Sequence, residues 1–306
     1  MMFLKIMLLS LLMSFFIACN KIRIPPQEKP VTIDFSNTVQ KTTSPADSVK
    51  PVNLEIAAMV SPRETLRYYE DLVHYISRKI GRPIKINQKK TYKEVNDQLK
   101  QRQIDAAFIC SGAFVEAKSR FPIEIIAVPV VNGKNTYNAD VIVRKNSPIR
   151  RFEDLRGKTF AFTDPLSNTG RLYAVERVRE LHSTPGKFFS KVIYTHGHDY
   201  SIQAVARGMV DGATVDGLVL NYIKAYYPEK VKNIRIIEIS KPFGMPPVVV
   251  HKNLDYQLKN KLRQVLLKMD KDPEGKKILE RLMIDKFVPG NEKDYLSISK
   301  SLKYTE

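Results

Sequence analysis

Apolar stretches of strand length alternate with amphipathic stretches of helical length along most of this 306-residue chain, and this alternation restricts the fold more than any other feature. The first strand is predicted over residues 54–60, LEIAAMV, and the first helix over residues 62–80. Ser61 can cap that helix, Pro62 occupies its first position, and Gly81 can end it. Thr91 can cap the second predicted helix. The continuing alternation predicts a mostly parallel sheet with helices on both faces.

The pattern restarts in the second half of the chain. Further strands are predicted over residues 138–147, within residues 152–165, and over residues 191–195 and 212–217, with helices between them. The chain is therefore predicted to contain two α/β units rather than one. In open sheets of this kind, ligands bind beyond the carboxyl ends of the strands and beside helix N-termini.

Polar or small residues occupy that edge of several predicted strands. The candidate ligand-binding residues are Ser61, Tyr92, Cys110, Ser111, Ser167, Asn168, Thr169, Gly170, His198 and Asp216. Each has an ordinary structural alternative, because hydroxyls and carboxylates cap helices, and tyrosine and cysteine fill cores. Their convergence from independent strand ends favours a cleft over capping alone.

The segment DPLSNTG, residues 164–170, precedes a predicted helix that runs to about Leu181. Ser, Asn and Thr are good helix caps, which is the simpler interpretation. A helix N-terminus also offers unpaired N–H groups and the positive end of a dipole, so the same segment can hold an anion. The local sequence leaves both interpretations open.

The N-terminus is typical of an exported protein. An apolar run over residues 6–18 follows Lys5; it is too short for a membrane-spanning helix of about 20 residues and fits a signal peptide over residues 1–18. Ala18-Cys19 resembles a bacterial lipobox, which implies cleavage before Cys19 and lipidation of its thiol. Residues 19–51 are rich in proline and polar residues, which predicts a disordered tether. The expected location is the cell envelope, lipid-anchored, in the periplasm or on the outer face of the cytoplasmic membrane.

The net charge of +18 suits an anionic ligand or an anionic membrane surface. No nucleic-acid reading module accompanies this charge, so nucleic acid is not an expected partner. The sequence offers no usual metal-ligand spacing and no set of nucleophile, base and orienting residue, so we expect no metal, no cofactor and no enzymatic activity. Cys110 has no partner for an intrachain disulfide in a chain whose only other cysteine is Cys19.

Four segments together resemble a known family. They are SPRET with YYEDLVHYISRKIGRPI, TYKEV with QIDAAFICSGAFV, DPLSNTG, and HDYSIQAVARGMVDGATVD. Their order and spacing over residues 54–250 are similar to those of the phosphate/phosphite/phosphonate-binding proteins of ABC transporters. The resemblance implies a two-lobed type II periplasmic-binding-protein fold, with mixed, mostly parallel sheets and a hinged cleft.

The resemblance also implies an organisation and a function. Lobe 1 is expected over residues 52–138 and 250–306, and lobe 2 over residues 139–249, with crossover strands near residues 137–143 and 239–249. A monomer would close on a small tetrahedral oxyanion (phosphate, phosphite or phosphonate) and deliver it to an ABC permease. The alternative is a sensory protein of the same fold that reports arsenite, arsenate or phosphonate to a histidine kinase.

Several candidate residues fall on positions that have roles in that family. Residues 167–170 match the phosphate-gripping turn, and Gly170 would let the backbone approach the ligand. His198 matches a ligand-facing histidine, which would titrate near physiological pH, although His196 could be the reader instead. Tyr92 would donate its hydroxyl. Asp216 matches a cleft carboxylate, which accepts an anion only if the anion carries a proton or an amine.

Two departures from the family pattern bear on the ligand. The chain has no tryptophan, and the extra acidic and aromatic residues of aminoalkyl-phosphonate readers cannot be placed, which favours a small inorganic oxyanion. Related arsenite sensors use a cysteine in the region of Cys110, and a thiolate is a soft ligand. One thiol is a poor arsenite site, so a buried core residue is the simpler interpretation of Cys110. Ser61 either donates to the ligand or caps its helix.

Overall fold

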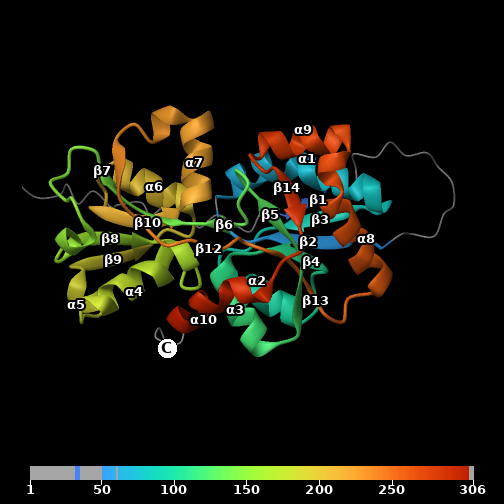
Figure 1. Cartoon of the computed structure of the whole chain (residues 1–306), viewed down its shortest axis with the longest axis horizontal. Helices are drawn as coiled ribbons and strands as arrows, with labels where there is room; N and C mark the ends of the chain where they lie inside the picture. Colours follow the sequence, from blue (N-terminus) through green and yellow to red (C-terminus); the bar gives the residue numbers. More distant parts are fainter. Residues whose placement is uncertain (1–31, 35–49, 60, 303–306) are drawn as a thin grey trace, which may run out of the picture.

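Helices flank two separate sheets in the computed structural model, which describes residues 32–34, 50–59 and 61–302 (Figure 1). The predicted signal peptide over residues 1–18 and the predicted lipidation site at Cys19 lie outside the described residues. Within the part of the chain that is described, no helix combines the length and the apolar character needed to cross a membrane.

The first sheet has seven strands in the order β1-β3-β2-β4-β13-β5-β14. Their bounds are β1 Thr32–Asp34, β2 Val52–Ile56, β3 Ile84–Asn87, β4 Ala106–Phe108, β5 Ile123–Val130, β13 Val248–His251 and β14 Lys286–Val288. The helices of this lobe are α1 Pro62–Ile80, α2 Tyr92–Lys100, α3 Ser111–Arg120, α8 Tyr256–Leu267, α9 Pro273–Arg281 and α10 Leu296–Leu302, with short turns η5 Met269–Lys271 and η6 Glu292–Tyr295. The central strand β4 is buried on both faces, because Ala106 and Phe108 join one apolar cluster and Ala107 joins the other.

The second sheet has five strands in the order β11-β7-β10-β8-β9. Their bounds are β7 Ala139–Arg144, β8 Thr159–Phe162, β9 Lys191–Tyr194, β10 Gly212–Asp216 and β11 Ile234–Ile239. The helices here are α4 Tyr173–Glu180, α5 Pro185–Phe188, α6 His198–Ala206 and α7 Gly217–Tyr226, with short turns η2 Phe152–Leu155, η3 Asn168–Leu172 and η4 Pro228–Lys230. Stacked phenylalanines fill one side of this sheet, with Phe160 and Phe189 4.4 Å apart between ring centres.

The two sheets form the two lobes of the molecule, as predicted (Figure 1). A short antiparallel pair, β6 Thr136–Tyr137 and β12 Phe243–Gly244, lies where the chain passes between them. Val248 and Val249 already belong to β13 of the first sheet, so the predicted boundary after residue 249 falls inside a strand. This apolar run is a single strand that pairs with both β4 and β5, and the local sequence pattern gave no signal that would place the lobe boundary before it.

The sheets are mixed, but the expectation that they are mostly parallel is wrong. The strand pairings comprise four parallel and seven antiparallel ones. Strands β13 and β7 enter the two sheets after the chain has crossed between the lobes, and each pairs antiparallel with both of its neighbours. Strand β14 was not predicted; it adds to the edge of the first sheet by antiparallel pairing with β5.

Local signals at three element ends have mixed outcomes. Thr91 caps α2 through a complete capping box with Glu94, as its position predicts. Ser61 occupies the N-cap position of α1, but its side chain makes no capping hydrogen bond. The tether predicted over residues 19–51 is ordered at Thr32–Asp34, because main-chain pairing with the exposed edge of β3 needs no apolar side chains.

Candidate functional site

The predicted residues converge on a buried region between the two lobes. Nearly all are less than 4% exposed, and Ser61 is 6% exposed. Tyr92, Cys110 and Ser111 come from the first lobe, at the starts of α2 and α3. Residues 167–170, His198 and Asp216 come from the second lobe. The strand-end rule therefore brought residues from distant parts of the chain to one place.

The turn at residues 167–170 is stabilised by its own side chains. Ser167 caps η3, because its Oγ accepts a hydrogen bond from the Gly170 amide at 3.0 Å. Gly170 is required by packing, since a Cβ there would lie 2.5 Å from Thr163 Oγ1. The Asn168 amide points at the Cys110 thiol. Capping thus accounts for part of this turn, and what remains for a ligand is mainly hydroxyl groups.

Two buried hydroxyls in this region have no partner among the described residues: Tyr92 Oη and Thr169 Oγ1. A buried polar group without a hydrogen bond costs about 1–3 kcal/mol. Burial raises the pKa of Tyr92 well above its usual range, and the charges of Cys110 and Asp164 add to the shift, so the phenol stays protonated as a donor. Ser167 lies near Tyr92 and opposes this shift, but no hydrogen bond of normal geometry joins the two side chains. Tyr92 Oη and Thr169 Oγ1 are therefore unsatisfied donors that a polar ligand could use.

The His198 ring lies next to Ser167 and remains neutral. Its Nδ1 accepts from the Asp216 amide at 3.1 Å, which places the ring proton on Nε2, 3.5 Å from Ser167 Oγ. Ser167 Oγ therefore accepts from both Gly170 and His198 and keeps its own proton for another acceptor. Burial lowers the pKa of His198 to about 3, so the expectation that it titrates near physiological pH is wrong. His196 is half-buried, outside this network.

Asp216 lies at the carboxyl end of β10 and caps α7. Its Oδ1 accepts from the amides of Leu218 at 2.8 Å and Val219 at 3.4 Å. Burial raises the pKa of Asp216 to about 7, although these two amides oppose the shift. The side chain can therefore be a neutral donor near neutral pH, which removes part of the repulsion that a carboxylate would exert on an anion.

We expect Asp216→Asn to change how stability depends on pH. The folded-state pKa of about 7 exceeds the ordinary value of 3.8, so the carboxyl favours the folded state below about pH 4, and this contribution is lost as the pH rises through about 7. Relative to the wild type, the Tm of Asp216→Asn should rise between about pH 4 and pH 7 and level off above pH 7. Thermal melts across this range measure the difference, and a constant difference would contradict the assignment.

A second polar cluster lies beside the first. Ser111 Oγ and Tyr137 Oη are 2.5 Å apart, and Asn168 Nδ2 donates to the same phenol at 3.4 Å. Tyr137 was not predicted, because nothing in its local sequence separates it from a core tyrosine. It belongs to β6, where the chain passes between the lobes, and only the fold brings it to Asn168 of the second lobe.

Cys110 is buried like a core residue and also lies against residues of the site. The thiol is 1% exposed and packs in the apolar cluster of the first lobe, as a core residue would. It also faces the amides of Asn168 and Gly112, which partly offset the rise in its pKa caused by burial. Among the described residues there is no second free cysteine and no group of acidic, histidine or cysteine side chains suited to a metal, so the arsenite interpretation gains no further ligand.

Direct hydrogen bonds join the two lobes around this region. The Tyr92 amide donates to Asp164 Oδ2 at 3.1 Å, and the Ser61 amide donates to Asp199 Oδ1 at 3.0 Å. The His198 amide donates to the Met59 carbonyl at 2.8 Å. Asp164 and Asp199 were not among the predicted site residues, although Asp164 lies in the segment between β8 and η3 and Asp199 in the first turn of α6. Ser61 contributes through its backbone, which fits neither of the two roles predicted for its side chain.

Two lobes that bury unsatisfied hydroxyls between them define a solute-binding protein. The comparisons with known proteins give the family: the model for periplasmic phosphonate substrate-binding proteins of ABC transporters matches residues 54–295. The chain belongs to that family. Its members are substrate-binding proteins, so the chain is a binding protein and not an enzyme.

Individual relatives agree with this family. The phosphonates-binding periplasmic protein of Escherichia coli K12 is 28% identical over 238 residues, which cover 76% of this chain and 70% of the relative. The crystal structure of a binding-protein component of an ABC phosphonate transporter from Pseudomonas aeruginosa is 26% identical, with a TM-score of 0.79 over 85% of this chain and 87% of that one. A Prochlorococcus marinus protein solved with methylphosphonate has a TM-score of 0.75 at 18% identity over 83% of this chain and 98% of that one, and shows the shared fold.

Proposed function

We propose that this protein captures a phosphonate outside the cytoplasm and delivers it to an ABC permease. The observation that carries the proposal is two buried, unpartnered hydroxyls in a family member, that of Tyr92 in the first lobe and that of Thr169 in the second. Ser167 and protonated Asp216 supply further donors. Hydrogen bonds to an anion are about twice as strong as neutral ones, and a water-free site strengthens them further.

The proposed mechanism is lobe closure. The interlobe hydrogen bonds of Asp164 and Asp199 can form only when the lobes are together, and a ligand that bridges Tyr92 and Thr169 adds to the same closed state. The two lobes, which contain the seven-stranded and the five-stranded sheet, would move about the β6/β12 pair. A monomer is sufficient for this action, and a lipid on Cys19, after removal of residues 1–18, would hold it at the membrane.

The ligand class is tested by calorimetric titration of the purified full-length chain with methylphosphonate, phosphite, phosphate, arsenite and sulfate. We expect methylphosphonate to bind at least tenfold more tightly than sulfate. With a pKa of about 7, Asp216 is partly ionised near neutral pH, and the ionised carboxylate accepts a hydrogen bond from a protonated phosphonate but repels sulfate, which has no proton to donate. Phosphate and phosphite belong to the same proposed class and should bind more weakly than methylphosphonate. Selective binding of arsenite that is lost in Cys110→Ser would overturn the proposal, as would the absence of any phosphonate binding. The sensory alternative has no feature of this site in its favour.

A further inference from the structure

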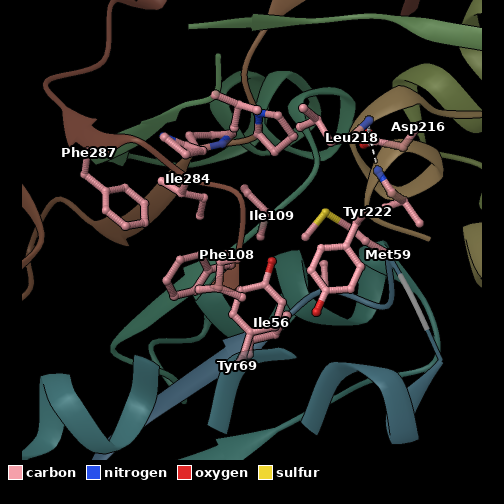
Figure 2. A pocket seen from close by; sticks show the side chains of 17 residues that line it. Ile56, Met59, Tyr69, Phe108, Ile109, Asp216, Leu218, Tyr222, Ile284 and Phe287 are labelled. Carbon is pink, nitrogen blue, oxygen red and sulfur yellow. Dashed lines mark hydrogen bonds between the residues drawn. The ribbon is translucent and has the colours of Figure 1, made fainter. Parts of the chain in front are cut away.

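An apolar cavity of about 130 Å³ is lined by residues of both lobes, among them Asp216 (Figure 2). Figure 2 shows Asp216 and Leu218 at one side of it and Ile284 and Phe287 at the other. Side chains from both lobes line its middle: Met59, Tyr69 and Ile109 from the first lobe and Tyr222 from α7 of the second. The unpartnered hydroxyls of Tyr92 and Thr169 do not line this cavity, so it is a separate part of the interlobe region.

Two residues that line the cavity also contact His198 of the hydroxyl site. Asp216 lines the cavity, while its amide donates to His198 and its charge acts on Tyr92 and Tyr137. Met59 lines the cavity as well, and its carbonyl accepts from the His198 amide. A ligand whose anionic group contacts the hydroxyls and whose remaining atoms pass Asp216 and Met59 would reach the cavity.

The walls of the cavity are unsuited to a charged substituent. Among the described residues that line it, Asp216 alone carries a carboxyl or amino group, and its Oδ1 already accepts two amide hydrogen bonds. Tyr69 contributes a neutral phenol, because burial raises its pKa to about 12. A buried ammonium group needs a charged partner, and the one carboxyl in this lining, Asp216, is kept largely neutral by burial below about pH 7, so we expect an aminoalkyl group to bind less tightly than an apolar group of the same size. An apolar group needs no charged partner there, and its transfer out of water contributes favourable free energy of binding.

We propose that the ligand carries an uncharged, apolar substituent larger than methyl, an alkyl or aryl group, which lies in this cavity. This inference rests on the proposed oxyanion site and specifies its substrate class. The size is consistent with the volume, since an apolar cavity of about 150 Å³ in another protein takes up benzene. The small inorganic oxyanion favoured by the lack of tryptophan is thereby replaced: the apolar lining is built from aliphatic side chains, tyrosine and phenylalanine.

The test compares phosphonates that share the anionic group, by calorimetry on the full-length chain. The panel is methyl-, n-propyl-, n-butyl-, phenyl- and 2-aminoethylphosphonate. Each buried methylene contributes about fourfold in affinity (about 0.8 kcal/mol), so n-propylphosphonate should bind at least tenfold more tightly than methylphosphonate. The 2-aminoethyl compound has the size of the n-propyl one and should bind at least tenfold more weakly than it.

A variant tests whether the substituent lies in the cavity. Ile284→Ala shortens a half-buried side chain at the side away from Asp216, and should lower the ratio of n-butyl- to methylphosphonate affinity by about threefold or more. Ile239→Ala, at a 60% exposed isoleucine outside the cavity, is the matched control and should leave that ratio unchanged.

The outcomes separate the two proposals. If methylphosphonate binds and n-propylphosphonate binds no better, or the 2-aminoethyl compound binds better than the n-propyl one, the apolar-substituent inference is overturned and the oxyanion site stands. An unchanged n-butyl-to-methyl ratio in Ile284→Ala overturns the placement in this cavity. If no phosphonate binds, both proposals fail together.

Discussion

A single methyl group added at Gly112 is expected to abolish ligand binding while both lobes stay folded. Gly112 lies in the first turn of α3, in the first lobe, and faces the chain just before the Ser167 turn of the second lobe. A Cβ on Gly112 would lie 2.2 Å from the Leu166 carbonyl oxygen and 3.0 Å from the Asn168 amide nitrogen. Both atoms belong to the backbone, so no change of side-chain rotamer relieves the clash.

The clash exists only when the lobes are together, so Gly112→Ala penalises closure and not the folding of either lobe. We expect methylphosphonate affinity to fall by at least about 100-fold, or about 2.7 kcal/mol, which is in the range of overpacking costs. Calorimetry measures the affinity, and small-angle scattering with saturating ligand should show that the variant stays more extended than the wild type.

Gly186→Ala is the matched control for this prediction. Gly186 lies in α5 of the second lobe, and a Cβ there would meet nothing within 4 Å. This variant should bind as tightly as the wild type. Normal affinity in Gly112→Ala would mean that the Leu166 segment does not approach α3 in the ligand-bound state, and the closed arrangement of the lobes would be wrong.

Removing the unpartnered hydroxyls should move stability and binding in opposite directions. Tyr92→Phe and Thr169→Val each delete a buried donor that contacts no acceptor in the ligand-free protein. Without ligand, each variant should be as stable as the wild type or up to about 1 kcal/mol more stable, because a desolvation cost disappears. A hydrogen bond to an anion contributes about 1.5–3 kcal/mol, so affinity for methylphosphonate should fall by about 10- to 100-fold in each.

Tyr295→Phe is the control for this pair of effects. Tyr295 is as deeply buried in the same lobe, but its hydroxyl donates to the Met245 carbonyl at 2.6 Å. Its loss should lower the free energy of unfolding by about 1 kcal/mol and leave methylphosphonate affinity unchanged. Melting curves and calorimetry on the three variants measure both quantities. A loss of stability in Tyr92→Phe comparable to that in Tyr295→Phe would show that the Tyr92 hydroxyl is satisfied within the protein.

Residues close together in the sequence were sufficient to predict most helices and strands and the location of the site. Helix limits depend on hydrogen bonds and steric restrictions within a few residues. The structure accordingly begins α2 after Thr91, which forms a capping box with Glu94, and has α1 begin at Pro62 and end before Gly81. The strand-end positions of Ser167, His198 and Asp216 follow from the same alternation, because strands that share a sheet present their ends together. The family resemblance, carried by these segments, is confirmed.

What each polar group does depends on atoms far away in the chain. The Ser167 hydroxyl accepts hydrogen bonds from Gly170 and His198. His198 is neutral because the fold buries its side chain completely. The Thr169 hydroxyl, only two residues from Ser167, has no partner among the described residues. No local pattern separates these cases. The antiparallel placement of β13 and the apolar cavity beside Asp216 likewise arise from contacts between segments more than 100 residues apart, since a hydrogen bond or a cavity is a property of neighbours in space.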